Sequence, residues 1–180
     1  MTSDMIRQRR IAVVTGASSG MGREFVRQIG YFYQDLDEIW VIARRKERLE
    51  QLREESRIPL RVFGGDLTKK QVYKEYHTAL RELSPDVRML VNGAGFGKSG
   101  TFAKIAVEGK KLQTDMVDLN CRALTRMTEM TLPWMGMGSR ILNLASAAAF
   151  CPQPGFAVYA ATKSYVLSFS RALGVELRKR

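Results

Sequence analysis

The chain of 180 residues has only two cysteines, Cys121 and Cys151, which lie thirty positions apart. This spacing fits no common zinc motif, and one pair of cysteines is not the disulfide framework of a small secreted domain. We therefore expect two reduced thiols in a cytoplasmic protein, and we expect no metal site.

Long hydrophobic runs are also missing. No stretch of eighteen apolar residues occurs, so the sequence predicts no membrane span. The apolar run Ile11–Val14 that follows the basic start of the chain is too short for a secretory signal peptide. The 15 glycines and five prolines follow no period, which excludes a collagen-like chain. An apolar share of 45% is that of a globular protein and excludes a disordered one.

Acidic residues are scarce beside basic ones. There are 29 Lys and Arg against 18 Asp and Glu, which gives a net charge of +11. Such an excess can indicate a module that binds nucleic acid. The basic residues are scattered, however, in small clusters at residues 7–10, 44–48 and 178–180 that are typical of a solvated surface. We therefore expect no nucleic-acid partner, and we rank a basic interaction module last among the possible functions.

Short apolar runs alternate with segments of helical periodicity. The apolar runs predict buried strands at Ile11–Val14, Ile39–Ile42, Leu60–Phe63, Met89–Val91 and Ile141–Leu144. Helices are predicted at about 21–33, from 45 onward, and at about 69–83, 115–130 and 159–178. This β-α-β series indicates an α/β fold with a doubly wound parallel sheet and helices on both faces. The length favours one domain over residues 1–180.

A glycine-rich loop follows the first predicted strand, with the sequence Thr15-Gly16-Ala17-Ser18-Ser19-Gly20-Met21-Gly22. Gly16 allows a tight exit from the strand. Gly20 and Gly22 lack Cβ atoms, so a pyrophosphate and the following helix can approach the backbone. The start of that helix offers free N–H groups to an anion. The loop therefore predicts a dinucleotide site, and a glycine-rich turn without a ligand is the alternative.

The pattern T-G-x-x-x-G-x-G from Thr15 to Gly22 resembles that of the short-chain dehydrogenase/reductase family, and the resemblance extends from about Arg10 to Arg180. It implies a Rossmann-type NAD(P)-binding domain and an oxidoreductase that moves a hydride between a nicotinamide and a small-molecule carbonyl or secondary alcohol. It also implies a homodimer or homotetramer. Members of the family continue past this point with further strands and a segment that covers the substrate, so the resemblance implies a chain that lacks this portion.

The end of the second predicted strand carries Ala43-Arg44-Arg45. An NAD site usually has a carboxylate there, which binds the ribose hydroxyls and would repel the additional phosphate of NADP. A guanidinium can hold that phosphate through two charge-assisted hydrogen bonds. We therefore expect NADP(H) to be preferred over NAD(H), with Arg44 as the first candidate and Arg45 as the second. Alternatively, both arginines start an exposed helix and touch only water.

Two further strand ends supply candidate cofactor contacts. In the resembling family the position of Asp66 contacts the adenine, with the backbone of its neighbour Leu67 alongside; the residues alone fit equally well with Asp66 as an N-cap of the next helix. The segment from Asn92 to Gly95 matches the family's N-N-A-G except for Gly93, whose missing side chain loses hydrogen bonds. The full set of predicted cofactor-binding residues is Gly16, Ser18, Ser19, Gly20, Met21, Gly22, Arg44, Arg45, Asp66, Leu67, Asn92, Ala94, Gly95, Tyr159 and Lys163.

The strongest chemical signal is the pair Tyr159 and Lys163. A spacing of four residues is about one helical turn, so both side chains project from the same face of a helix. A lysine near a phenol favours its ionised form. Such a phenol can donate a proton to a ketone oxygen or take one from an alcohol. By resemblance, Lys163 also holds the nicotinamide ribose.

The resemblance assigns two more catalytic residues. Ser146 lies thirteen positions before Tyr159 and would hydrogen-bond the substrate carbonyl, unless it is a turn or capping serine. Asn120 would hold a water that leads to the lysine, unless it is a polar residue at a helix surface. The catalytic set is thus Asn120, Ser146, Tyr159 and Lys163. The favoured interpretation is an NADP-dependent oxidoreductase, and the alternative is a nucleotide-binding protein of the same fold without turnover.

Overall fold

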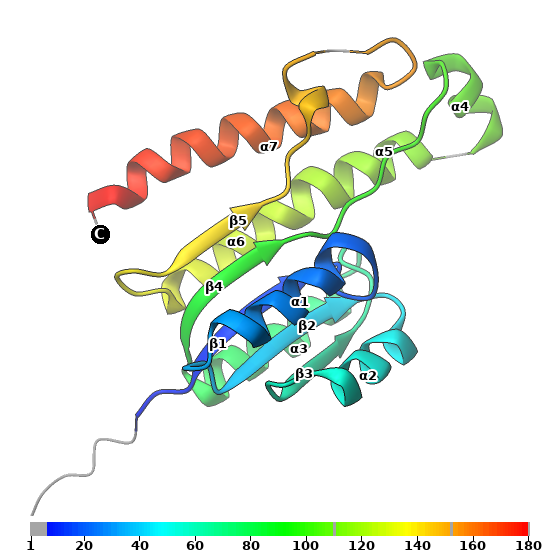
Figure 1. The fold of residues 1–180 in the computed structure, drawn as a ribbon. Coiled ribbons are helices and arrows are strands. Elements are labelled where there is room, and N and C mark those ends of the chain that lie inside the picture. Colours follow the sequence, from blue (N-terminus) through cyan, green and yellow to red (C-terminus); the bar gives the residue numbers. More distant parts are fainter. Residues whose placement is uncertain (1–6, 110, 152, 180) are drawn as a thin grey trace, which may run out of the picture.

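The computed structural model describes residues 7–109, 111–151 and 153–179. Within them, five parallel strands form one sheet in the order β3-β2-β1-β4-β5 (Figure 1). Because the chain builds outward from β1 in both directions, the predicted doubly wound parallel sheet is confirmed. The strands are β1 (Arg10–Thr15), β2 (Glu38–Ala43), β3 (Leu60–Gly64), β4 (Asp86–Asn92) and β5 (Arg140–Asn143).

Helices connect the strands and lie on both faces of the sheet (Figure 1). The sequence did not predict α4, a short helix without a long apolar stripe. The α-helices are α1 (Gly20–Phe32), α2 (Lys46–Glu55), α3 (Lys70–Leu83), α4 (Phe102–Glu108), α5 (Leu112–Val117), α6 (Leu124–Thr131) and α7 (Ala157–Glu176). The shorter helical turns are η1 (Asp118–Ala123), η2 (Leu132–Trp134), η3 (Ala147–Ala149) and η4 (Leu177–Lys179).

Two hydrophobic layers hold the sheet between its helices. Successive residues of a strand point to opposite faces. Ile11 and Val13 of β1 therefore pack with α3 and α6, where Tyr76 is fully buried. Ala12 and Val14 pack with α1 and α2 on the other face. Burial on both faces explains why β1 and β2 are continuous apolar runs without alternation.

The predicted helix over about 115–130 is present, but it is not α-helical throughout. The π-helical turn η1 separates α5 from α6 and contains Asn120. The sequence pattern could not reveal it, because Met116, Ala123 and Met127 remain buried on one side of the whole segment. Single π-helical turns inside α-helices occur often at functional sites.

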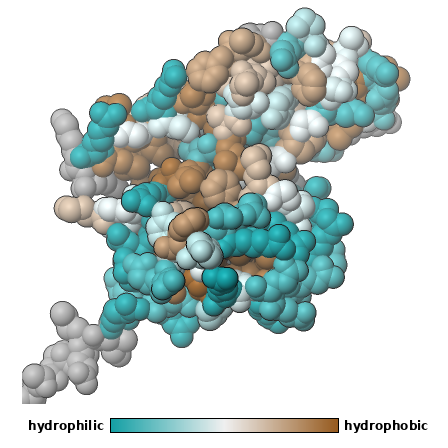
Figure 2. Space-filling model, in the orientation of Figure 1, coloured by the Kyte–Doolittle hydropathy of each residue, from teal (hydrophilic) through white to brown (hydrophobic). Residues whose placement is uncertain are grey.

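Helix α7 packs along α5, η1 and η3 at the end of the molecule opposite β3 (Figure 1). Figure 2 shows hydrophobic residues gathered over this part of the visible face, whereas the part around α1 and α2 is mostly hydrophilic. Among the described residues, no helix has the length and apolar character that crossing a membrane requires.

Candidate active site

A pocket of about 290 Å³ opens where β1, β2, β3 and β4 end. The carboxyl ends of parallel strands are the usual place for a ligand in such a sheet. The lining includes all the predicted cofactor-binding residues except Asn92, Tyr159 and Lys163, and it adds residues that the sequence did not point to. The lining residues are Gly16, Ser18, Ser19, Gly20, Met21, Gly22, Ile42, Ala43, Arg44, Arg45, Gly65, Asp66, Leu67, Gly93, Ala94, Gly95 and Leu119.

The glycines of the first loop are required by its geometry. Gly16 has a φ of +73°, and a Cβ at this position would lie 2.8 Å from the Cα of Ala94. Gly22 is the third residue of α1, and its Cβ would lie 2.4 Å from the carbonyl oxygen of Gly16. The missing side chains thus let α1 begin directly against the end of β1, with its N-terminus at the pocket.

Thr15 joins two of the loops that line the pocket. Its buried Oγ1 accepts hydrogen bonds from the backbone N–H groups of Gly93 and Ala94, both at 3.1 Å. The absence of a side chain at Gly93 has its own cause, since a Cβ there would lie 2.8 Å from the carbonyl oxygen of Thr15. The loop after β4 is therefore anchored through its backbone, without the side chain that the family pattern has at this position.

Asn92 lies at the end of β4 and is not among the residues that line the pocket. Its Nδ2 donates to Thr128 Oγ1 at 3.0 Å and to Asn143 Oδ1 at 2.8 Å. The side chain is buried and ties β4 to β5 and α6. It lies where it can hold the strand ends in place.

Arg44 and Arg45 both line the pocket, and Arg45 is fixed by the glycine loop. Its Nη2 donates to Ser19 Oγ at 2.6 Å and to Ser18 Oγ at 3.2 Å. The alternative that these arginines touch only water is therefore wrong for Arg45. Arg44 is exposed at the same rim. The bond between Arg45 and the serines was not expected, because 26 or 27 positions separate the partners.

Asp66 lines the pocket but does not cap α3. The N-cap residue of that helix is Lys69. Asp66 Oδ1 instead accepts from the backbone N–H of Thr68 at 2.8 Å and from its hydroxyl at 2.9 Å. This turn orients the carboxylate where the chain leaves β3, and the N-cap alternative is wrong.

Tyr159 and Lys163 lie one turn apart near the start of α7. Lys163 Nζ is 5.7 Å from the centre of the Tyr159 ring and donates to the carbonyl oxygen of Leu144 at 2.6 Å. Lys163 is only 8% exposed, and this burial lowers its pKa below the ordinary value for lysine. Leu144 follows β5 directly, so the ammonium group lies at the same edge of the sheet as the pocket.

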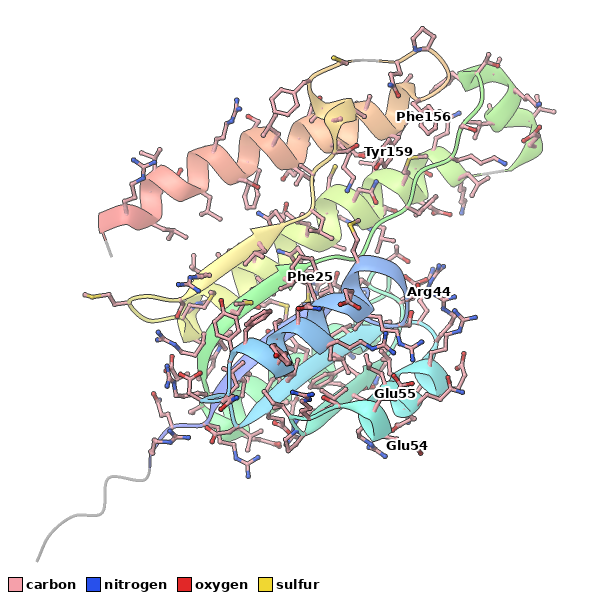
Figure 3. All side chains as sticks on the ribbon, in the orientation of Figure 1. Phe25, Arg44, Glu54, Glu55, Phe156 and Tyr159 are labelled. Atoms are coloured by element: carbon pink, nitrogen blue, oxygen red, sulfur yellow. The ribbon has the colours of Figure 1, made fainter. Side chains whose placement is uncertain are left out.

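The Tyr159 ring contacts the loop after β4 and the start of its own helix. A Cβ at Gly97 would lie 2.9 Å from its Cδ2, so the loop after β4 passes directly against the ring. The ring also meets Phe156, the N-cap residue of α7, edge to face, with 5.8 Å between the ring centres. In Figure 3, Tyr159 and Arg44 lie beyond the same end of the sheet, the end toward which the strand arrows point.

Asn120 is buried in the π-helical turn and touches both neighbouring elements. Its Oδ1 accepts from the N–H of Phe96 at 3.0 Å, and its Nδ2 donates to the carbonyl oxygen of Phe96 at 2.9 Å and to Thr162 Oγ1 at 3.0 Å. The alternative of a polar residue at a helix surface is therefore wrong. Three of the four hydrogen bonds that an asparagine side chain can make are used within the protein.

Ser146 stands after β5 as the N-cap of η3. Its Oγ accepts from the N–H of Ala148 at 3.2 Å, so the capping alternative describes one of its contacts. A hydroxyl has one hydrogen to donate as well, and accepting this bond does not use it. Ser146 can therefore both cap the turn and donate to a ligand.

These elements bring the predicted residues to one edge of the sheet. The model of the short chain dehydrogenase family matches residues 10–180. The chain belongs to the short-chain dehydrogenase family. The resemblance expected from the sequence is confirmed.

Relatives in this family are oxidoreductases. An uncharacterized oxidoreductase of Staphylococcus epidermidis is 30% identical over 96% of this chain and 73% of its own length. Among solved structures, a bulky-bulky ketone specific alcohol dehydrogenase from Comamonas testosteroni is 32% identical with a TM-score of 0.79. A short-chain dehydrogenase from Sphingobium yanoikuyae, solved with NADPH, is 29% identical with a TM-score of 0.77. Both solved chains are matched over 93% of this chain and 66% of their own.

The chain is shorter than its relatives. It spans about two thirds of the two solved chains and about half of the very-long-chain 3-oxoacyl-CoA reductases that it also matches. The family takes nicotinamide cofactors, as the NADPH-bound relative illustrates. Within the part of the chain that the structure describes, no group of three or more His, Cys, Asp or Glu is placed to hold a metal ion.

Proposed function

We propose that the protein is an NADP-dependent oxidoreductase that transfers a hydride between the nicotinamide and a carbonyl or secondary alcohol. The observation that carries this proposal is the place of two predicted catalytic residues, Asn120 and Lys163. Gly95 lines the pocket, and a Cβ at Gly95 would lie 2.9 Å from Asn120 Oδ1 and 3.7 Å from Lys163 Nζ. These two residues thus contact a residue that lines the predicted cofactor site.

The residues present fit a dinucleotide. The glycine loop and the start of α1 would hold the pyrophosphate, and Asp66 with Leu67 would contact the adenine. Ala94 and Gly95 supply backbone along the middle of the pocket, and Lys163 would bind the nicotinamide ribose. The bound nicotinamide supplies or accepts the hydride.

The chain's own residues would handle the proton. Tyr159 donates its phenolic hydrogen to the substrate oxygen during reduction and takes a proton back during oxidation. The ammonium of Lys163 stabilises the negative charge left on the phenol. Ser146 donates a hydrogen bond to the same substrate oxygen. Asn120 holds the surrounding loops and, by resemblance, a water that returns protons through Lys163.

Preference for NADP(H) over NAD(H) is part of the proposal. No carboxylate stands at the end of β2, where Arg44 and Arg45 offer two guanidinium groups. Fluorescence titration that measures the dissociation constants of NADPH and of NADH tests this preference. Tighter binding of NADPH than of NADH is expected, and equal or reversed affinities would contradict the preference.

The role of Tyr159 is tested by Tyr159→Phe, which removes only the hydroxyl. With NADPH and a panel of aliphatic and aryl ketones, kcat should fall by about 100-fold or more, the range that a positioned proton donor contributes. NADPH affinity should stay within about twofold. Tyr165→Phe on the same helix is the matched control, because its hydroxyl bonds Thr125.

Full turnover by the Tyr159→Phe protein would refute the proposed role. NADPH binding by the unmodified protein without turnover of any carbonyl would favour the nucleotide-binding alternative.

A homodimer or homotetramer and a cytoplasmic location complete the proposal. Val117 on α5 and Val175 on α7 are exposed, and hydrophobic residues lie among hydrophilic ones on the visible face around α7 (Figure 2). Such patches favour association. Sedimentation velocity tests the assembly. Cys121 and Cys151 are free thiols, and Cys151 is exposed, which suits a reducing compartment. Cell fractionation tests the location.

A further inference from the structure

Thr162 lies between Tyr159 and Lys163 in sequence and is not part of the catalytic set. Its side chain is 3% exposed. The hydroxyl donates to the carbonyl oxygen of Tyr159 at 2.7 Å and accepts from Asn120 Nδ2 at 3.0 Å. One oxygen atom therefore connects the turn that bears the catalytic tyrosine to the π-helical turn.

The connection continues from Asn120 to the loop after β4. The Asn120 side chain holds both the N–H and the carbonyl oxygen of Phe96, at 3.0 and 2.9 Å. The same loop passes against Lys163 at Gly95 and against the Tyr159 ring at Gly97. Any shift of Phe96 would therefore move the backbone on which both catalytic side chains rest.

The backbone of Thr162 adds a further contact to the same element. Cys121 Sγ donates to the carbonyl oxygen of Thr162 at 3.8 Å. Thr162 and its neighbours thus contact two successive residues of the π-helical turn. Asn120 and Cys121 lie 42 and 41 positions before Thr162 in the sequence.

We propose that Thr162 is a positioning residue for catalysis, whose hydroxyl sets the place of Tyr159 and Lys163 relative to the loop that lines the cofactor pocket. It touches neither substrate nor cofactor and acts through Asn120 and Phe96. The kinetic part of this inference rests on the proposed function. A misplacement of about 1 Å at reacting groups can cost on the order of 100-fold in rate.

The test compares Thr162→Val, Thr162→Ser and the unmodified protein. Valine keeps the shape and removes both hydroxyl bonds. We expect kcat for ketone reduction to fall by about 10- to 100-fold, with NADPH affinity and ketone KM within about twofold. Serine keeps the hydroxyl, so it should restore at least half of the rate.

Thr125→Val is the matched control. Thr125 Oγ1 bonds the carbonyl oxygen of Cys121 at 3.0 Å and the Tyr165 hydroxyl at 2.7 Å, so it also joins the η1–α6 segment to α7, but it does not contact the catalytic side chains. Its kcat should equal that of the unmodified protein. An equal loss of kcat in both valine variants, or full kcat in Thr162→Val, would overturn the inference while leaving the proposed function intact.

A second measurement does not depend on turnover. Hydrogen exchange of the backbone over residues 93–97 should be faster in Thr162→Val than in Thr162→Ser or Thr125→Val, because Asn120 loses one of its anchors. Unchanged exchange in Thr162→Val would overturn the inference, whether or not the protein turns over a ketone. A lack of turnover by the unmodified protein would instead contradict the proposed function. If the valine variant does not fold, Thr162→Ala against Thr162→Ser gives the same comparison.

Discussion

Replacing Gly22 with alanine adds one methyl group where α1 meets the end of β1. The new Cβ would lie 2.4 Å from the carbonyl oxygen of Gly16 and 2.7 Å from its carbonyl carbon. Non-bonded carbon atoms prefer separations of about 3.5–4.0 Å. Both obstructing atoms belong to the backbone, so the start of α1 must move away from the loop as a unit.

The expected cost follows from that contact. Overpacking of this kind typically destabilises by about 1–3 kcal/mol, and the better helix propensity of alanine offsets at most about 1 kcal/mol. For a chain of this size, each kcal/mol lowers Tm by roughly 2–4 °C. The start of α1 lines the pocket, and a helix N-terminus is where a pyrophosphate would bind. Because Gly22→Ala displaces this helix start, NADPH affinity should fall by about tenfold.

Gly174→Ala is the matched control for thermal unfolding and NADPH titration. Gly174 lies in α7, where a Cβ would meet nothing within 4 Å. Its replacement should raise stability by up to about 1 kcal/mol through helix propensity and leave NADPH affinity unchanged. If Gly22→Ala melts and binds NADPH like the unmodified protein, the tight junction between α1 and the loop is not required, and the reasoning is refuted.

Two predictions concern charged groups. Arg44→Leu should weaken NADPH binding by about 10- to 100-fold, the value of hydrogen bonds to a charged group, and NADH binding much less. Arg48→Leu on the exposed side of α2 is the control, and equal losses for both cofactors would contradict the phosphate role. Burial lowers the pKa of Lys163, so between its folded and unfolded values the unfolded chain binds more protons. The free energy of unfolding of the unmodified protein, relative to that of Lys163→Met, should therefore rise between pH 7 and pH 10. Urea unfolding of both proteins at both pH values measures this difference. A difference that stays constant would contradict the prediction.

The centre of the sheet could be predicted because β1 and β2 are buried on both faces. The runs at Ile11–Val14 and Ile39–Ile42 lie inside β1 and β2, which extend one residue further at each end. The π-helical turn at Asp118–Ala123 could not be predicted, since Met116, Ala123 and Met127 have the spacing of an ordinary α-helical stripe. Its position around Asn120 is visible only in the structure.

The candidate site shows the same division. The glycine loop and the pair Tyr159 and Lys163 are local patterns, so the sequence could place them on a strand end and one helix face. The contacts between Arg45 and Ser19, and between Asn120 and Thr162, join segments that are far apart in the chain. No local pattern encodes them, because each depends on how two helices or loops pack.

The buried hydroxyl of Thr15 has a consequence for ligand binding. Its two hydrogen bonds join the end of β1 to the loop after β4, so the protein's own contacts order the backbone along this part of the pocket. Ordering a loop costs conformational entropy, and a ligand that meets an already ordered loop does not bear that cost. Binding of a dinucleotide in this pocket should therefore require little rearrangement of these loops. Any rearrangement on binding should be concentrated at the exposed side chains of Arg44 and Arg45.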